Sequence, residues 1–233
     1  MILPPPPPMR LREYPVLDRI TQPNGIRHYV EPNGTPLPSV TTILSETADK
    51  TFLKEWQERV GEKAANKARD DGTALGTLVH THMENYILGE PRPGGNNLIR
   101  QMAKRMSDQI IMKGLPEVDE IWGVEAMLYF SGLYAGTTDL VGVYKGKPAI
   151  MDFKNAKKMR KRDQIEDYFC QGSAYGMAHD VLFGTQIETI AIFMVSRDLQ
   201  YQTFVVEGDE YYRYAEQYHN RIKEYEAKIS VKA

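Results

Sequence analysis

The sequence predicts a single mixed domain of the α+β or α/β class. Helical patterns fill the first half of the chain, three strand-like segments follow, and a helix, two strands and a closing helix complete it. That order is typical of helices packed on one sheet, and no internal repeat interrupts it. A chain of 233 residues can bury roughly 70% of its unfolded surface in one core without disulfides or metals.

The composition excludes several classes of protein. Charged residues make up 26% and hydrophobic residues 42%, and 29 basic side chains face 31 acidic ones for a net charge of −2. These values exclude disorder over the whole chain and a uniformly basic nucleic-acid wrapper, but they leave open a nuclease with local basic runs. The lone Cys170 excludes an internal disulfide or a multi-cysteine cluster, and we expect it to fill a core position.

The sequence gives no sign of a membrane or export segment. No apolar run approaches the roughly 20 residues of a membrane helix, and the N-terminus lacks the order of a secretory signal. We therefore expect a cytoplasmic protein with no membrane partner.

The N-terminal region, residues 1–38, is expected to hold an extended segment and a hairpin. A proline tract and a short basic stretch occupy residues 1–12, which we expect to be extended and mobile. Residues 27–31 resemble a strand, and Pro32-Asn33-Gly34 is a strong turn signal.

A helical region is expected over residues 39–115. Ser39 is a good N-cap for a short helix, and Asp71-Gly72 is expected to break the helical pattern. The remaining helices are expected at residues 51–70, 74–88 and 98–113.

Residues 116–233 are expected to form the central sheet and its flanking helices. The strands are expected at 121–130, 133–144, 147–153, 189–196 and 202–206, and the helices at 164–179 and 210–228. Five tyrosines of the last helix could stack on bases, although core packing is the stronger interpretation: Tyr211, Tyr212, Tyr214, Tyr218 and Tyr225.

The sharpest chemical signal is an apolar strand that ends in Asp152-Phe153-Lys154. Residues two apart on a strand share a face, so the Asp152 carboxylate and the Lys154 ammonium point the same way. The preceding strand carries Asp139, and the tight turn at Lys145-Gly146 should pair the two strands and bring both carboxylates together. Two such carboxylates can hold Mg²⁺ or Mn²⁺, although Asp-x-Lys alone is a common way for a strand to end.

Further residues strengthen that interpretation. His80 and Glu84 lie four apart on one helix face, and Glu125 interrupts an apolar strand. Because a buried unpaired carboxylate is unfavourable, Glu125 should have a partner or a metal. Gln171 and Tyr175, also four apart, follow on the next helix.

The order Gly-Thr-x-x-His, Glu, Gly-x-x-Asp, Asp-x-Lys, Gln-x-x-x-Tyr resembles the PD-(D/E)XK nuclease superfamily, and in particular its RecB-type exonucleases. Within them, Pro38-Ser39-Val40-Thr41-Thr42-Ile43-Leu44 and the following helix with Trp56 resemble the branch of mitochondrial genome maintenance exonucleases and their phage-encoded relatives. The resemblance covers residues 36–200. The first aspartate sits in Thr-Thr-Asp139 rather than Pro-Asp, and the single cysteine excludes the iron–sulfur subtype.

The resemblance implies a restriction-endonuclease-like core, a mixed sheet flanked by helices, and a role for each motif residue. Asp139, Asp152, the carbonyl of Phe153, His80 and Glu125 would bind the metal. Lys154 would position the water and the scissile phosphate. Gln171 and Tyr175 would orient Lys154 and the nucleic-acid backbone. The residues expected on nucleic acid are Ser39, Thr41, Trp56 and Thr77. In that family the helices before the core form an arch over the site, a role that we assign to residues 50–113.

A basic run follows the Asp-x-Lys strand. It consists of Lys157, Lys158, Arg160, Lys161 and Arg162. Beside a phosphodiesterase centre such a run is expected to contact the nucleic-acid backbone, since phosphate contacts dominate affinity.

The sequence therefore predicts a metal-dependent DNA exonuclease, single-strand preferring, acting in phage-type replication, recombination or end processing. Its expected partners are free-ended DNA and replication or recombination proteins. A double-strand exonuclease, a structure-specific endonuclease and a binding module with a decayed site stay open as alternatives.

Overall fold

The computed structural model describes residues 2–21 and 27–232, and its centre is a five-stranded mixed sheet. In spatial order its strands are β4 (Val118–Phe130), β5 (Tyr134–Tyr144), β6 (Lys147–Ala156), β7 (Thr189–Ser196) and β8 (Tyr201–Glu207). Neighbours pair antiparallel except β6 and β7, which run parallel. A parallel step needs a long crossover, and α5 (Glu166–Phe183) supplies it.

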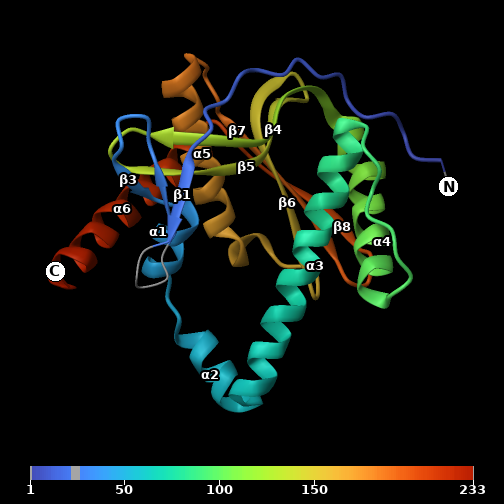
Figure 1. Cartoon of the computed structure of the whole chain (residues 1–233), viewed down its shortest axis with the longest axis horizontal. Coiled ribbons are helices and arrows are strands. Elements are labelled where there is room, and N and C mark those ends of the chain that lie inside the picture. The colour runs from blue at the N-terminus through green and yellow to red at the C-terminus, as the bar shows by residue number, and fades with distance from the viewer. Residues whose placement is uncertain (1, 22–26, 233) are drawn as a thin grey trace.

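Helices cover the sheet on both faces (Figure 1). α1 (Val40–Thr47), α5 and α6 (Asp209–Lys232) share one core with Ile150 and Ile192 of the sheet. The second half of α3 (Glu62–Leu88) and α4 (Leu98–Lys113) share the other core with Met151 and Phe193. Because side chains alternate across a strand, neighbouring residues of β6 enter opposite cores. The predicted α/β class and mixed sheet are confirmed.

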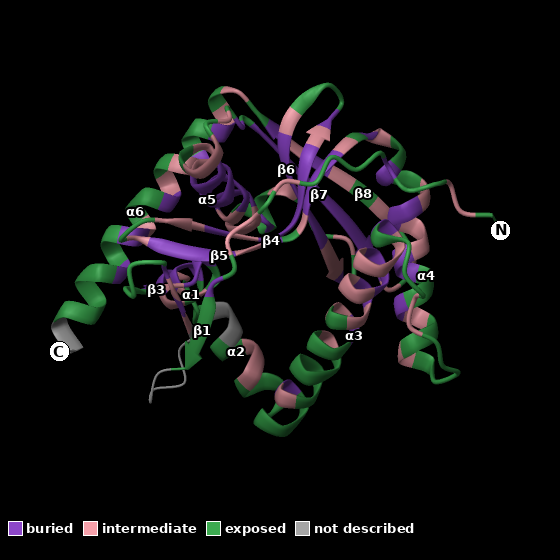
Figure 2. Ribbon diagram, turned by 45° about the horizontal axis from the view of Figure 1, so that its top comes forward, coloured by how far each residue is buried: buried purple, intermediate pink, exposed green. Residues whose placement is uncertain are grey.

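The first part of the helical region projects away from the sheet. α2 (Thr51–Val60) and the first turns of α3 extend beyond the body of the protein in Figure 1, and Figure 2 shows them largely exposed. The prediction that Asp71-Gly72 breaks a helix is wrong, because α3 runs through both residues. The break lies at Gly61, whose φ of +84° suits glycine.

Only part of the segment 50–113 projects from the sheet, and the arch assigned to that segment stays a prediction. Leu75, Val79, Met83 and Ile87 of α3 and the inner face of α4 are buried in the core beside the sheet. The segment that projects therefore consists of α2 and of α3 up to about Thr73. Among the residues of this segment whose burial is described, Ala65 alone is buried.

The N-terminal segment lies against the sheet. Arg10 and Arg12 donate backbone hydrogen bonds to the carbonyls of Ile121 and Trp122, and Ile121 donates to Pro8. The expectation of a mobile segment is therefore wrong for residues 8–12, because the open edge of β4 supplies backbone partners that the local sequence does not reveal.

A small antiparallel sheet follows, with β1 (Asp18–Thr21), β2 (Arg27–Val30) and β3 (Pro36–Pro38). Its predicted turn is confirmed, since Gly34 donates to the carbonyl of Glu31. The sheet packs on β5 through Leu37 and Ala135.

Several local predictions are confirmed. The helix at 98–113 and the strand at 189–196 have the predicted bounds, and Ser39 caps α1 by accepting from the Thr42 amide. Cys170 is buried, as are four tyrosines of α6, whereas Tyr212 is exposed. Two short 3-10 turns complete the chain, at Leu115–Glu117 and Arg162–Gln164. Within the described residues, no helix combines the length and apolar character that crossing a membrane requires.

Candidate active site

The candidate site forms where β5 and β6 separate. Their ladder runs from Tyr144↔Lys147 and ends at Leu140↔Met151, so the next pair in register is Asp139 and Asp152. Instead of a ladder bond, the Asp139 Oδ2 accepts the Phe153 amide at 2.8 Å. The predicted hairpin therefore brings the two carboxylates together, and the separation of the strands leaves their side chains available.

Glu125 joins this site from β4. The flanking pairs Val124↔Leu140 and Ala126↔Thr138 place Glu125 directly across from Asp139. Its φ of +47° is rare for a residue with a side chain, and such conformations gather at functional sites. The local distortion of β4 thus turns a carboxylate toward the Asp139 carboxylate.

His80 reaches the same carboxylate from α3. Its Nδ1 lies 3.3 Å from Asp139 Oδ1. Gly76, one turn earlier, explains how α3 comes so close to the sheet, because a Cβ there would lie 3.0 Å from Asn155 Oδ1. The glycine of the Gly-Thr-x-x-His motif therefore serves helix–strand contact, and the histidine uses the proximity.

Lys154 lies in a chain of polar contacts on the α5 side. Its Nζ is 2.6 Å from Asp152 Oδ2 and donates to Gln171 Oε1 at 3.3 Å. Gln171 in turn donates to the Tyr175 hydroxyl at 3.4 Å. The structure thus brings Gln171 and Tyr175 into one chain of contacts with the Lys154 ammonium, and their role in orienting it stays a prediction.

Gly136 of the Gly-x-x-Asp motif makes room for that chain. A Cβ at Gly136 would lie 2.8 Å from both Cε1 and the hydroxyl of Tyr175. Tyr175 is buried, so its ring has little space to move aside. Two motif glycines are therefore spacers for motif side chains.

Three of the predicted ligands form a cluster suited to a cation. Ligand atoms of His80, Glu125 and Asp139 all lie within 4.8 Å of one another. Carboxylate oxygens with one imidazole nitrogen suit a hard divalent ion such as Mg²⁺ or Mn²⁺. The residues therefore fit the predicted metal. Asp152 lies beside this cluster in its ion pair with Lys154, and its role as a ligand, like that of the Phe153 carbonyl, stays a prediction.

Burial and charge shift the pKa values of His80, Glu125 and Asp152. Burial lowers the pKa of His80, but the Asp139 carboxylate more than offsets this and raises that pKa to about 9. Glu125 is exposed rather than buried as the sequence suggested, but desolvation near the cluster and the Asp139 charge raise its pKa to about 7. Burial raises the pKa of Asp152 to about 6, although Lys154 opposes the change. Crowded carboxylates with raised pKa values are typical of functional sites.

Lys154 and Asp139 keep their charges. Burial acts to lower the pKa of Lys154, but Asp152 and Asp139 hold it above its ordinary value. Burial acts to raise the pKa of Asp139, but His80 and Lys154 hold it below its ordinary value. Lys154 is thus a cation beside a carboxylate cluster, suited to bind a phosphate oxygen or a water rather than to accept a proton.

The basic run after β6 divides into two kinds of residue. Arg162 is engaged within the protein, since it pairs with Glu210 at 2.5 Å and donates to the Val205 carbonyl at 3.0 Å. Its assignment to nucleic acid is therefore the weakest of the five. Lys157, Lys158, Arg160 and Lys161 are exposed.

The other residues expected on nucleic acid are more scattered. Ser39 is nearly buried and its hydroxyl caps α1, whereas Thr41 and Thr77 are exposed and Trp56 is half-buried on α2. Sequence reasoning missed Tyr168, whose ring lies 4.8 Å below the Lys154 ammonium. Tyr168 lies three residues before Gln171 and so shares its helix face, and this spacing could have predicted that Tyr168 lies near Lys154.

Comparison with known proteins finds relatives that are named as exonucleases. Mitochondrial genome maintenance exonuclease 1 of Mus musculus is 26% identical over 173 residues, which cover 70% of this chain and 50% of that protein. The Xenopus tropicalis protein of the same name is 26% identical over 185 residues, covering 71% and 50%. The chain spans about half the length of the curated relatives it matches. No family model matches it.

A solved structure adds evidence for the fold. The crystal structure of an Eubacterium rectale protein whose given name includes the word exonuclease matches with a TM-score of 0.50. It is 12% identical and the match covers 68% of this chain and 66% of that one. The resemblance to PD-(D/E)XK nucleases is confirmed. A mixed sheet with a carboxylate pair and a lysine where β5 and β6 separate is the arrangement that the resemblance implies.

Proposed function

We propose that this chain is a metal-dependent deoxyribonuclease, an exonuclease that prefers single strands. The observation that carries the proposal is the convergence of His80, Glu125 and Asp139 beside the Asp152–Lys154 ion pair. The names of the relatives point to the same class of activity. Such an enzyme would serve DNA replication, recombination or end processing.

The cluster would hold one Mg²⁺ or Mn²⁺ through the His80 imidazole and the Glu125 and Asp139 carboxylates. When bound, the ion would act as a Lewis acid toward a phosphoryl oxygen and lower the pKa of a bound water. Binding requires His80 to be neutral, so the proton that Asp139 now stabilises on the imidazole must leave.

The remaining residues would act on the phosphate and the attacking water. The Lys154 ammonium, 2.6 Å from Asp152, can donate to a non-bridging phosphate oxygen and stabilise the charge that develops there. Gln171 and Tyr175 would hold its Nζ in place, and the Tyr168 ring adds a cation–π contact.

Access to the site supports action on free ends. The chain runs from α1 through α2 into α3 in a loop that projects beyond the sheet (Figures 1 and 2). Further along, α3 carries His80 to its contact with Asp139. A strand that enters beneath such a loop must be threaded by an end. This geometry favours an exonuclease over the endonuclease alternative, since access rather than metal chemistry decides between them.

Hydrolysis of a panel of DNA substrates tests the proposal. Linear single strands, linear duplexes and covalently closed single-stranded circles are incubated with Mg²⁺, Mn²⁺ or Ca²⁺. We expect rapid release of nucleotides from linear single strands with Mg²⁺ or Mn²⁺, and resistance of the circle. Efficient nicking of the circle under the same conditions would overturn the exonuclease proposal and leave the nuclease proposal standing.

Matched variants test the site itself. Asp139→Asn and Lys154→Gln should each lose at least a hundredfold in rate, whereas Asp209→Asn and Lys223→Gln, at exposed positions of α6, should leave the rate unchanged. Lys154→Gln should retain metal binding by calorimetry, because lysine is not one of the proposed ligands. Activity above a tenth of wild type in Asp139→Asn would contradict the metal assignment.

A further inference from the structure

A basic groove begins next to the candidate site. It is a hollow of about 530 Å³ between α3 and the segments that follow β6 and β7. Four cationic side chains line it: Arg69, Lys157, Arg160 and Arg197. They come from three separate parts of the chain, and two of them, Arg69 and Arg197, lie outside the run that the sequence singled out.

The basic groove adjoins the metal-ligand cluster along α3 and β6. Arg69, Thr73, Gly76 and His80 lie at helical spacing along one stripe of α3, and the first three line the groove. Eleven residues of helix separate Arg69 from His80 along about 16 Å. On the opposite wall, Asn155 follows Lys154 directly in β6. One stripe of helix therefore connects the site to the far end of the groove.

The cations of the groove are available for an external anion. Among the described residues, none of the four forms an ion pair within 4.0 Å. Asp71, the one acidic residue of the lining, pairs with Lys67 at 3.5 Å. The Nε of Arg197 is buried and lacks a hydrogen-bond partner in the described part of the chain. Buried donors are rarely left unpaired, so this nitrogen calls for an acceptor.

The groove continues beyond Arg160. A second hollow of about 520 Å³ shares Arg160, adds Lys161 and the paired Arg162, and runs along β8 from Gln202 to Val205. The two hollows thus meet at one arginine, and their cations extend from α3 to the edge of the sheet.

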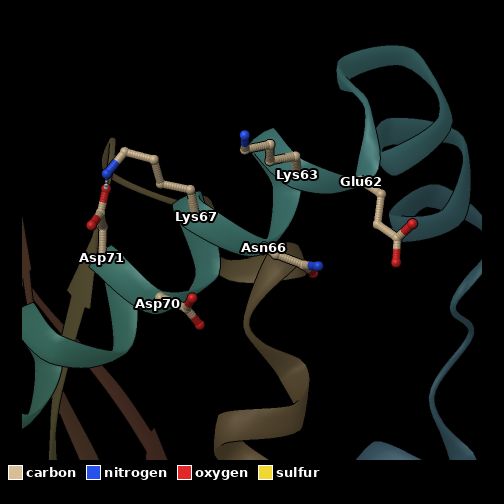
Figure 3. A pocket seen from close by; sticks show the side chains of 6 residues that line it. All are labelled: Glu62, Lys63, Asn66, Lys67, Asp70 and Asp71. Atoms are coloured by element: carbon tan, nitrogen blue, oxygen red, sulfur yellow. Dashed lines mark ion pairs between the residues drawn. The ribbon is translucent and has the colours of Figure 1, made fainter.

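The projecting end of α3 differs in charge from the groove. Figure 3 shows six polar side chains on this part of the helix, namely Glu62, Lys63, Asn66, Lys67, Asp70 and Asp71. Three carboxylates outnumber two lysines there, and one lysine is already paired. These charges nearly cancel, so we expect phosphates to bind the face of α3 that carries Arg69 and lines the basic groove, rather than the face shown in Figure 3.

We propose that the basic groove holds the phosphodiester backbone of a single nucleic-acid strand next to the scissile phosphate, with Arg69 and Arg197 gripping it from opposite walls. The proposal rests on the proposed function for the direction of the strand toward His80, but the groove's affinity for a polyanion does not depend on hydrolysis. Arginine suits this task because its planar fork matches a phosphate group.

Binding measured without hydrolysis tests the groove separately from the reaction. The full chain is titrated in EDTA with a short 3′-labelled oligothymidylate, between about 50 and 200 mM salt. Two lost phosphate contacts in Arg69→Gln/Arg197→Gln should reduce the log–log salt slope by about 1.4 and weaken binding roughly 25-fold at 0.1 M salt. The control Lys63→Gln/Lys67→Gln removes the same charge from the projecting end of α3 and should change the slope little. Circular dichroism and thermal unfolding check that both variants fold.

The outcomes separate the two proposals. Equal losses in the groove variant and its control would overturn the groove, as would an unchanged slope. A loss confined to oligonucleotides with a 5′-phosphate would also overturn it, in favour of a site for a terminal phosphate. If the wild type binds through the groove but hydrolyses nothing with Mg²⁺ or Mn²⁺, the groove stands and the proposed function fails.

Discussion

Replacing Gly136 by alanine tests the claim that this glycine makes room for Tyr175. The new Cβ would lie 2.8 Å from Cε1 and from the hydroxyl of Tyr175, and 3.2 Å from Cζ. Carbon atoms in contact prefer about 3.5–4.0 Å, so the ring or β5 must shift by roughly 0.7 Å or more. The ring is buried, and its hydroxyl accepts from Gln171 at 3.4 Å, so a shift also disturbs the contacts of Lys154.

The expected magnitude follows from two opposing effects. Overpacking in a core costs about 1–3 kcal/mol. Alanine also reduces the conformational entropy of the unfolded chain, which offsets this destabilisation by about 0.4–1 kcal/mol. We therefore expect Gly136→Ala to lower the free energy of unfolding by about 1–2 kcal/mol. With an m value of about 2 kcal/mol per M, the urea midpoint should fall by about 0.5–1 M.

A double-mutant cycle isolates the contact. Tyr175→Leu removes the ring atoms that the new Cβ meets, so Gly136→Ala should be tolerated in that background, with a coupling of about 1–3 kcal/mol. Gly72→Ala is the matched control. It lies inside α3 with no atom within 4 Å of its Cβ position, and should gain about 1 kcal/mol. Additive effects of Gly136→Ala and Tyr175→Leu would refute the role of Gly136.

Three further predictions concern charge. Without metal the pKa of Glu125 is about 7 and that of His80 about 9, so binding of Mg²⁺ or Mn²⁺ at neutral pH should release protons and become tighter as pH rises. Calorimetry in two buffers of different ionisation heat measures this proton release. Metal binding without proton release would contradict the ligand set. His80→Ala should abolish hydrolysis, whereas His82→Leu should preserve it. Burial and Arg92 lower the pKa of His82 to about 4. The neutral imidazole therefore contributes stability above about pH 6.5, and this contribution is lost as pH falls toward 4. Chemical denaturation at several pH values should show that His82→Leu lacks this pH-dependent loss of stability. Arg162→Gln should reduce stability through its lost pair with Glu210 and change DNA affinity little. Lys158→Gln should reduce DNA affinity and change stability little. If denaturation and binding titrations show instead that Arg162→Gln loses affinity but not stability, Arg162 belongs to the nucleic-acid surface.

The parts of the site that the sequence predicts depend on short-range geometry. The tight turn at Lys145-Gly146 fixes the register of β5 and β6, so Asp139 and Asp152 face each other with little input from the rest of the chain. Strand alternation then places Lys154 beside Asp152. His80 was recognised by its motif, but its contact with Asp139 depends on the approach of α3 at Gly76, which no local pattern reveals.

The parts that the sequence did not predict depend on tertiary context. A glycine inside a helix costs only about 1 kcal/mol, so Gly72 was tolerated while Gly61, with positive φ, ended α2. The convergence of Arg69 and Arg197 requires the parallel pairing of β6 and β7, across a separation of more than a hundred residues. Likewise, the pair that engages Arg162 lies on the last helix, and the run of five basic residues contains no sign of it.

The N-terminal segment has a consequence for the order of folding. Arg10 and Arg12 bond to Ile121 and Trp122, and Tyr14 bonds to His179 at 3.1 Å. These contacts join residues more than a hundred positions apart, so they close very long loops and raise the contact order of the fold. The edge of β4 on which the segment lies exists only after the hairpin with β5 has formed. We therefore expect attachment of residues 8–14 to be a late step, and the amides of residues 9–14 should be the first along this edge to exchange with solvent in the native protein.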